Sequence, residues 1–183
     1  MKMLFLSSLL LAGLFITSCS SSEDPQSSGE SLVSLKVQTD AGFQSRIVDE
    51  SGYSDLNNYT VQLLKDGEVQ TNWIWNYAEI PSSIKVSAGN YQLKAFYGED
   101  SPASTQSMYV EGVSEILNVT GTEEDVQTLS VVCKPVCAKV IVTFAKDMDT
   151  YFSDYSVTIK TQALGEESFV WRKNDTDPVY LKV

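Results

Sequence analysis

Tyr59-Thr-Val-Gln-Leu-Leu-Lys-Asp-Gly-Glu-Val69 is the segment from which the fold class is predicted most directly. Apolar side chains occupy every second position from Tyr59 to Leu63, which is the period of a strand with one buried face. Asp66-Gly67 then supplies the residue pair that a two-residue hairpin turn prefers. A returning strand follows, from Val69 through Asn72-Trp-Ile-Trp-Asn-Tyr77. This stretch therefore predicts an antiparallel hairpin.

The same alternation recurs on both sides of the hairpin. Ser87-Ala-Gly-Asn90 predicts a second hairpin turn, and no amphipathic pattern of helical period persists for three turns. Many short strands separated by Gly, Pro and Asp turns predict an all-β sandwich. The segments expected to be extended are 32–39, 59–63, 69–77, 84–86, 91–97, 108–110, 116–119, 126–133, 140–144, 157–161, 169–171 and 179–183.

The N-terminus has the features of a secretory signal. Met-Lys-Met precedes an apolar run from Leu4 to Ile16, which is too short to span a bilayer. Cys19 comes directly after Ile16-Thr-Ser18 and resembles a bacterial lipobox cysteine. The resemblance implies cleavage before Cys19, diacylation of its thiol and acylation of its new amine. The alternative is a plain signal peptide that happens to contain a cysteine.

The chain divides accordingly into three parts. Residues 1–18 are the expected lipoprotein signal peptide, and residues 19–31 are a flexible, Ser-rich and acidic tether. Residues 32–183 are expected to form one β-sandwich domain, or two small ones if the strands divide. The last expected strand stops at Val183 without a turn or a polar tail, so a chain truncated at its C-terminus and a chain that ends there both stay open.

The net charge and the acidic residues after Cys19 indicate which partners and which location to expect. The formal net charge is −11, and an acidic protein repels nucleic acid and anionic lipid surfaces. Membrane attachment therefore depends on the lipid on Cys19. Glu23 and Asp24, directly after a run of serines, resemble the export signal of Bacteroidetes-type lipoproteins. That resemblance implies a lipid anchor in the outer membrane with the protein facing the cell exterior, and a solvated linker is the alternative.

The sequence offers little catalytic chemistry. There is no histidine, which rules out Ser-His and Cys-His nucleophiles, and there is no Gly-rich phosphate loop. A carboxylate pair for glycoside hydrolysis stays open as a weak alternative. Asp147, Asp149 and Asp154 lack the central glycine and closing glutamate of a calcium loop. We therefore expect no enzyme activity, no cofactor and no metal site.

The remaining cysteines lie in Cys133-Lys-Pro-Val-Cys137. On an extended strand, residues four apart are separated by about 13 Å, which is beyond the reach of a disulfide. A turn or bulge at Pro135 would bring them together. Two half-buried thiols are the favoured interpretation, and a disulfide between Cys133 and Cys137 is the alternative.

An aromatic row is the candidate ligand contact. Trp73, Trp75 and Tyr77 share one face of the predicted strand, while Asn72, Ile74 and Asn76 share the other. A flat aromatic row of this kind stacks on sugar rings in carbohydrate-binding proteins. The alternative is that the row faces the core and the asparagines face water. We favour the core, because the opposite face is polar and one face must be buried.

Three stretches together resemble the fimbrillin-like lipoproteins of Bacteroidetes. They are the lipobox with the later loop Phe43-Gln-Ser-Arg-Ile-Val-Asp49, the segment Ser87-Ala-Gly-Asn-Tyr-Gln-Leu-Lys-Ala95, and Ala138-Lys-Val-Ile-Val-Thr-Phe144, which looks like the family's central strand. The resemblance implies a transthyretin-like, immunoglobulin-like Greek-key sandwich. It also implies a role in pili or adhesion.

In that family, a trypsin-like protease removes the first strand after an arginine, and a neighbour's strand then fills the groove. Applied here, the resemblance implies processing at Arg46 and release of an edge strand, residues 32–40. The expected function is therefore a surface lipoprotein of adhesion or pilus assembly whose protein partners bind by strand addition. The alternative is a carbohydrate-binding accessory lipoprotein of a glycan-uptake system.

Overall fold

The computed structural model describes residues 29–40, 51–122 and 124–183, so the predicted signal peptide, Cys19 and Arg46 lie outside the described residues. Within the described part the chain is all-β, as predicted, apart from short 3-10 turns and a four-residue helix, α1 (Met148–Tyr151). The strands are β1 (Ser31–Thr39), β2 (Thr60–Lys65), β3 (Glu68–Asn76), β4 (Ser83–Val86), β5 (Gly89–Tyr97), β6 (Ala103–Ser104), β7 (Val110–Val113), β8 (Leu117–Val119), β9 (Gln127–Pro135), β10 (Cys137–Val140), β11 (Ser156–Ile159), β12 (Phe169–Arg172) and β13 (Val179–Lys182).

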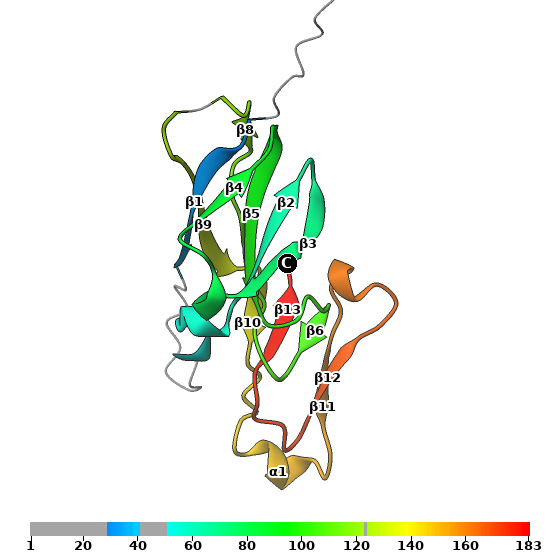
Figure 1. Ribbon diagram of the computed structural model, residues 1–183. Helices are drawn as coiled ribbons and strands as arrows, with labels where there is room; N and C mark the ends of the chain where they lie inside the picture. Colours follow the sequence, from blue (N-terminus) through cyan, green and yellow to red (C-terminus); the bar gives the residue numbers. More distant parts are fainter. Residues whose placement is uncertain (1–28, 41–50, 123) are drawn as a thin grey trace, which may run out of the picture.

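The main sheet curls into two layers (Figure 1). Its strand order is β3-β2-β5-β7-β9-β1-β4, and β8 pairs with β5 beside this path. The strands β3, β2 and β5 form one layer, while β9, β1 and β4 form the other. The layers join through β7 and β9, and the two edge strands β3 and β4 are consecutive in the chain. This curled sheet confirms the predicted all-β sandwich.

The predicted hairpin at Asp66-Gly67 is confirmed as the β2–β3 connection. Both residues have positive φ, 52° and 85°, as a type I′ turn requires. The Asp66 carboxylate also accepts a hydrogen bond of 3.1 Å from the Asn90 backbone N–H. Further along, the register shifts, since Gln62 pairs with Ile74 whereas Leu64 pairs with Val69. The edge strand β3 therefore carries a bulge, with more residues than β2 over the same span.

The second predicted hairpin, at Ser87–Asn90, is wrong. β4 pairs with β1, whereas β5 pairs with β2, β7 and β8. The chain therefore crosses from one layer to the other at this point. Turn-forming residues specify a change of direction, but the partner of the next strand depends on which apolar face it buries.

The first strand is an interior strand of the sheet, so the expectation of an edge strand is wrong. β1 runs parallel to β9 from Val33 to Thr39 and antiparallel to β4 from Ser31 to Ser34. Ser31 is only 1% exposed, so the predicted tether also ends earlier than expected. Alternating burial looks the same in edge and interior strands, which is why the sequence did not distinguish them.

Two apolar clusters lie along the molecule. The first core fills the space between the two layers. The second core lies between the β10-β13-β6 sheet and the β11–β12 hairpin. The first core is built around Val33, Leu35, Val61, Leu63, Tyr91, Leu93, Val110, Leu129, Val131 and Cys133, and the second around Leu164, Trp171, Val179 and Leu181.

β13 links the two cores. Tyr180 belongs to the first core, and its neighbours Val179 and Leu181 belong to the second. β10 lies at the edge of its sheet and ends at Val140. The expected strand over 140–144, and the central position implied for it by the resemblance, are therefore wrong. The β-branched run contributes Val142 and Phe144 to the second core without pairing as a strand.

Candidate functional site

The aromatic row of β3 packs on the first core. Trp73, Trp75 and Tyr77 are half-buried and contact it, while the side chains between them are exposed. The rings of Trp73 and Tyr91 lie 6.2 Å apart between centroids, tilted by 55°. Tyr77 begins a 3-10 turn just past the strand. The row therefore covers the edge of the sandwich, and much of its surface is taken up by packing.

The two cysteines are buried and are not bonded to each other. The Cys133 thiol lies 3.5 Å from the Ala95 carbonyl oxygen, and the Cys137 thiol lies 3.6 Å from the Tyr109 carbonyl oxygen. Burial raises the pKa of Cys133 to about 11, and the nearby Glu111 charge acts in the same direction. This thiol is therefore protonated at neutral pH and a poor nucleophile.

A polar group lies on the outer face of β5 and β7. Lys94 and Glu111 form an ion pair of 2.7 Å, and Tyr109 donates a short hydrogen bond to the same carboxylate. Burial opposes the ionisation of Glu111, but the hydrogen bonds from Lys94 and Tyr109 outweigh it and lower the pKa. Burial, followed by the bond to Glu111, raises the pKa of Tyr109. The group ties two adjacent strands together.

Carboxylates in the acidic loop around α1 are hydrogen-bonded to other groups of the protein itself. Asp149 accepts hydrogen bonds from Lys173 at 2.6 Å and from Tyr155 at 3.0 Å, and the Lys173 bond lowers the pKa of Asp149. Asp154 accepts from the Tyr155 backbone N–H. Among the described residues, no group of three or more Cys, Asp or Glu side chains is arranged to hold a metal ion.

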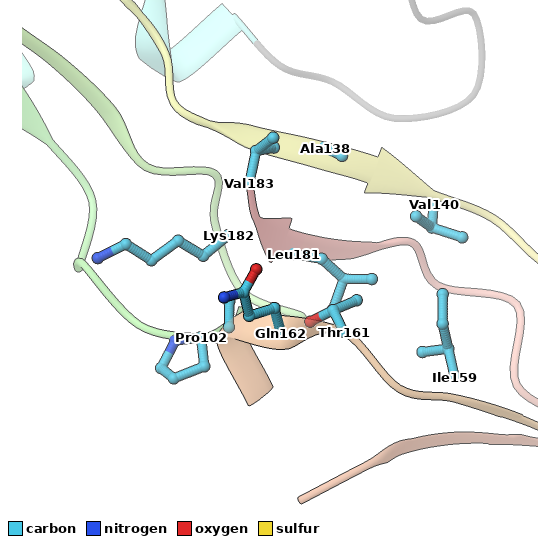
Figure 2. A pocket seen from close by; sticks show the side chains of 10 residues that line it. Pro102, Ala138, Val140, Ile159, Thr161, Gln162, Leu181, Lys182 and Val183 are labelled. Atoms are coloured by element: carbon cyan, nitrogen blue, oxygen red, sulfur yellow. The ribbon is translucent and has the colours of Figure 1, made fainter. Parts of the chain in front are cut away.

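An apolar groove of about 720 Å³ opens beside the second core. One wall comes from β10 and β13, with Ala138, Val140 and Leu181, and the other comes from Ile159 and residues 161–163. Figure 2 shows Val140 and Ile159 on facing sides of this hollow, with Lys182 directed away from it. The groove is therefore bordered by two edge strands, β10 and β11.

A second hollow, of about 270 Å³, lies at the β12–β13 connection. Its lining combines an aromatic wall with amide, hydroxyl and carboxylate side chains. Sequence reasoning found neither hollow. Ile159, Trp171 and Leu181 were recognised as strand residues, but the pattern does not tell which side of a strand is left open. The lining residues of this polar pocket are Thr105, Phe169, Trp171, Asn174, Asp175, Thr176 and Asp177.

In the described part of the chain, no helix has the length and apolar character needed to cross a membrane.

Comparison with known proteins shows the family to which the chain belongs. A family model described as "Domain of unknown function (DUF4493)" matches residues 29–183. No curated protein matches the chain, and no solved structure does so either. The matched range takes in β1, both cores and both hollows.

Proposed function

Since this chain belongs to the DUF4493 family, whose description assigns no activity, we propose a function from its sequence and sites. It is a lipid-anchored structural or adhesion subunit on the outside of the outer membrane, without catalytic activity. Cys19 carries the lipid, and a neighbouring protein binds by adding a strand. The observation that supports this best is the apolar groove between the edge strands β10 and β11.

The groove suits an extended segment in three respects. Its lining is mainly aliphatic, with Val140, Ile159 and Leu181 facing the hollow. Edge strands such as β10 present backbone groups to which a further strand can add. The second core is also thinly covered, because Val140 and Ile159 remain half-buried. A strand with alternating apolar side chains would bury this surface and complete the small sandwich.

The groove is tested by site-specific photocrosslinking on intact cells. A benzophenone side chain replaces Gln162, which lines the groove and is exposed, and the matched control replaces Glu167, which is exposed outside it. We expect position 162 alone to give a product whose crosslinked peptide, mapped by mass spectrometry, has alternating apolar residues. The same product from both positions, or none from position 162, would contradict the proposal.

A blocking variant gives an independent measurement. Ala138→Glu places a charge in the groove at an exposed position, whereas Thr158→Glu places one on β11 outside the lining. Neither side chain belongs to the second core. We expect Ala138→Glu to abolish the crosslink from position 162 and Thr158→Glu to preserve it. Equal crosslinking in the two variants would show that the groove is not the docking place.

The anchor is tested by labelling. Cys19 directly follows the short apolar segment Leu4–Ile16, and several acyl chains together anchor a protein stably. Labelled palmitate should enter the wild-type protein and not Cys19→Ala, and protease should reach the wild-type protein on intact cells. Equal labelling of both proteins would end the anchor proposal without touching the groove.

A further inference from the structure

The polar pocket at the β12–β13 connection has a rigid aromatic wall. The rings of Phe169 and Trp171 meet edge to face, with 4.6 Å between centroids and 68° between planes. Trp171 is 1% exposed and belongs to the second core. Phe169 is half-buried and lines the pocket. Part of its ring therefore remains available to a ligand.

The loop opposite this wall is fixed at both ends. The Trp171 indole N–H donates to the Asp177 carbonyl oxygen at 3.4 Å. The Asp175 carboxylate accepts from the Arg172 backbone N–H at 2.8 Å, and the Asp175 N–H donates to the Arg172 carbonyl oxygen at 2.9 Å. Pro178, the next residue along, is buried. These contacts hold the loop in place against the wall without using its other polar side chains.

Three polar side chains of the loop stay available. Asn174, Thr176 and Asp177 line the pocket and are exposed, and their side chains make no hydrogen bond within the part of the chain that the structure describes. Together they offer an amide and a hydroxyl, which donate and accept hydrogen bonds, and a carboxylate, which accepts them. Thr105 adds a second hydroxyl from beyond β6. No basic side chain lines the pocket.

We propose that this pocket binds one neutral sugar unit at the end of a glycan chain. A pyranose ring has an apolar C–H face that packs on an aromatic ring and a rim of hydroxyls that bond to amides and carboxylates. The volume of about 270 Å³ lies below the range of drug-sized ligand sites and suits a single ring. Asp175 and Asp177 repel acidic sugars, as does the net charge of −11.

This site is separate from the groove and does not depend on strand addition. Through this pocket, an adhesion subunit binds a sugar receptor independently of the groove. It also places sugar recognition away from the aromatic row of β3, whose rings pack on the first core. Loss of sugar binding and loss of the groove crosslink are therefore distinguishable results.

Titration of the purified full-length lipoprotein in detergent, followed by ¹⁵N–¹H NMR, tests the proposal. The probes are methyl β-galactoside, methyl α-mannoside and N-acetylglucosamine, with N-acetylneuraminic acid as the acidic sugar. We expect at least one neutral probe to shift the Trp171 indole signal and the amides of residues 174–177 saturably, while the Trp73 and Trp75 indoles do not move. We expect a Kd on the order of 1 mM for a single sugar ring.

Three variants test which residues of the pocket bind the sugar. Asn174→Ala and Asp177→Ala each remove a hydrogen-bonding group from an exposed loop, and each should weaken binding roughly tenfold. Phe169→Leu keeps an apolar side chain in the second core but removes the ring, so binding should fall while the unfolding midpoint changes little. Asp125→Ala, an exposed acidic residue outside the pocket, is the matched control and should bind as wild type.

Several results would overturn the proposal. One is the absence of saturable shifts with all three neutral probes. Another is binding that persists unchanged in the Asn174→Ala, Asp177→Ala double variant. Equal binding of N-acetylneuraminic acid would remove the charge argument and with it the proposed ligand class.

Discussion

Gly112 lies where the two layers of the main sheet meet. A Cβ atom at this position would lie 2.6 Å from the Val132 carbonyl oxygen and 2.7 Å from a methyl group of Val131. Both distances are shorter than van der Waals contact allows. The absence of a side chain therefore lets β7 approach β9 closely enough for the sheet to turn from one layer into the other.

Gly112→Ala should destabilise the fold by about 2 kcal/mol, because backbone atoms of β9 must shift to admit the methyl group. Urea unfolding followed by tryptophan fluorescence measures this change. The control is Val113→Ala at the next residue, whose side chain is 47% exposed. It should change the free energy of unfolding by less than about 0.5 kcal/mol. A Gly112→Ala protein as stable as wild type would mean that the junction is looser than the structure shows.

The buried thiol of Cys133 makes the free energy of unfolding depend on pH in the alkaline range. Burial raises its pKa to about 11, from a value near 9.0 for an exposed thiol. Between these values the unfolded chain releases the thiol proton while the folded chain keeps it, so the free energy of unfolding falls as pH rises. This contribution is fully present below about pH 9 and is lost through about pH 11.

The measurement compares unfolding of wild type and Cys133→Ala across this pH range. The wild-type protein should lose more stability between pH 9 and 11 than the variant does, since tyrosines titrate in both. In the folded wild type at pH 8, the thiol of Cys133 should also react slowly with an alkylating reagent and rapidly after unfolding. Parallel pH profiles of the two proteins would contradict the assignment.

At the scale of elements, β3 is an edge strand that resists pairing with other chains. The register with β2 shifts between Gln62 and Leu64, so the regular ladder is interrupted in the middle of the strand. A bulge twists an edge strand and interrupts its row of unpaired backbone groups, so that another chain pairs with it less readily. The aromatic row on the same strand packs inward, with Trp75 paired in register to the buried Val61. β3 therefore closes the side of the sandwich.

Trp75→Ala should cost about 2 kcal/mol of stability. Complete burial of such a ring is worth about 3–5 kcal/mol, and this ring is only half-buried. The matched control is Ile74→Ala, which lies on the opposite face of β3 and is 45% exposed. Chemical denaturation should therefore separate the two variants clearly. Equal midpoints for Trp75→Ala and wild type would favour an exposed sugar platform.

At the scale of the whole molecule, β1 ties the chain's first described segment into the sandwich. Its parallel partner β9 lies far away in sequence, and β4 covers its other side over Ser31–Ser34. Val33, Leu35 and Val37 all belong to the first core. Removing this strand would open that core along its length, so its release needs far more disruption than the release of an edge strand.

Limited trypsin digestion tests this consequence. If trypsin cuts after Arg46, the fragment that contains β1 should stay bound to the remainder, because strand pairing and the first core hold it. Gel filtration in native buffer should show one complex, and mass analysis in denaturant should show two fragments. Spontaneous loss of the small fragment, with ordered multimers of the large one, would instead support the strand-release mechanism of the fimbrillin-like resemblance.

Most of the local structure of this protein could be predicted from its sequence alone. A two-residue apolar period correctly predicts strands such as β2, β5 and β9, and Asp66-Gly67 predicts the hairpin between β2 and β3. Beyond Val140 the same period, with Val142 and Phe144, gives no strand. The inward face of Trp73 and Trp75 also followed from Asn72 and Asn76, which lie on the opposite face of the strand. Each of these inferences depends only on residues a few positions apart, and the alternation of side chains along a strand can be recognised at that range.

Apart from the β2–β3 hairpin, the pairing of the strands, and therefore the position of the sites, became apparent only in the three-dimensional structure. Ser87–Asn90 crosses between layers instead of closing a hairpin, and β1 lies inside the sheet. The groove beside Val140 and the pocket beside Phe169 likewise depend on faces left open by distant elements. The physical reason is that the entropy of closing a loop rises only slowly with its length. Burial of apolar faces across the whole chain, rather than proximity in sequence, therefore selects the partners.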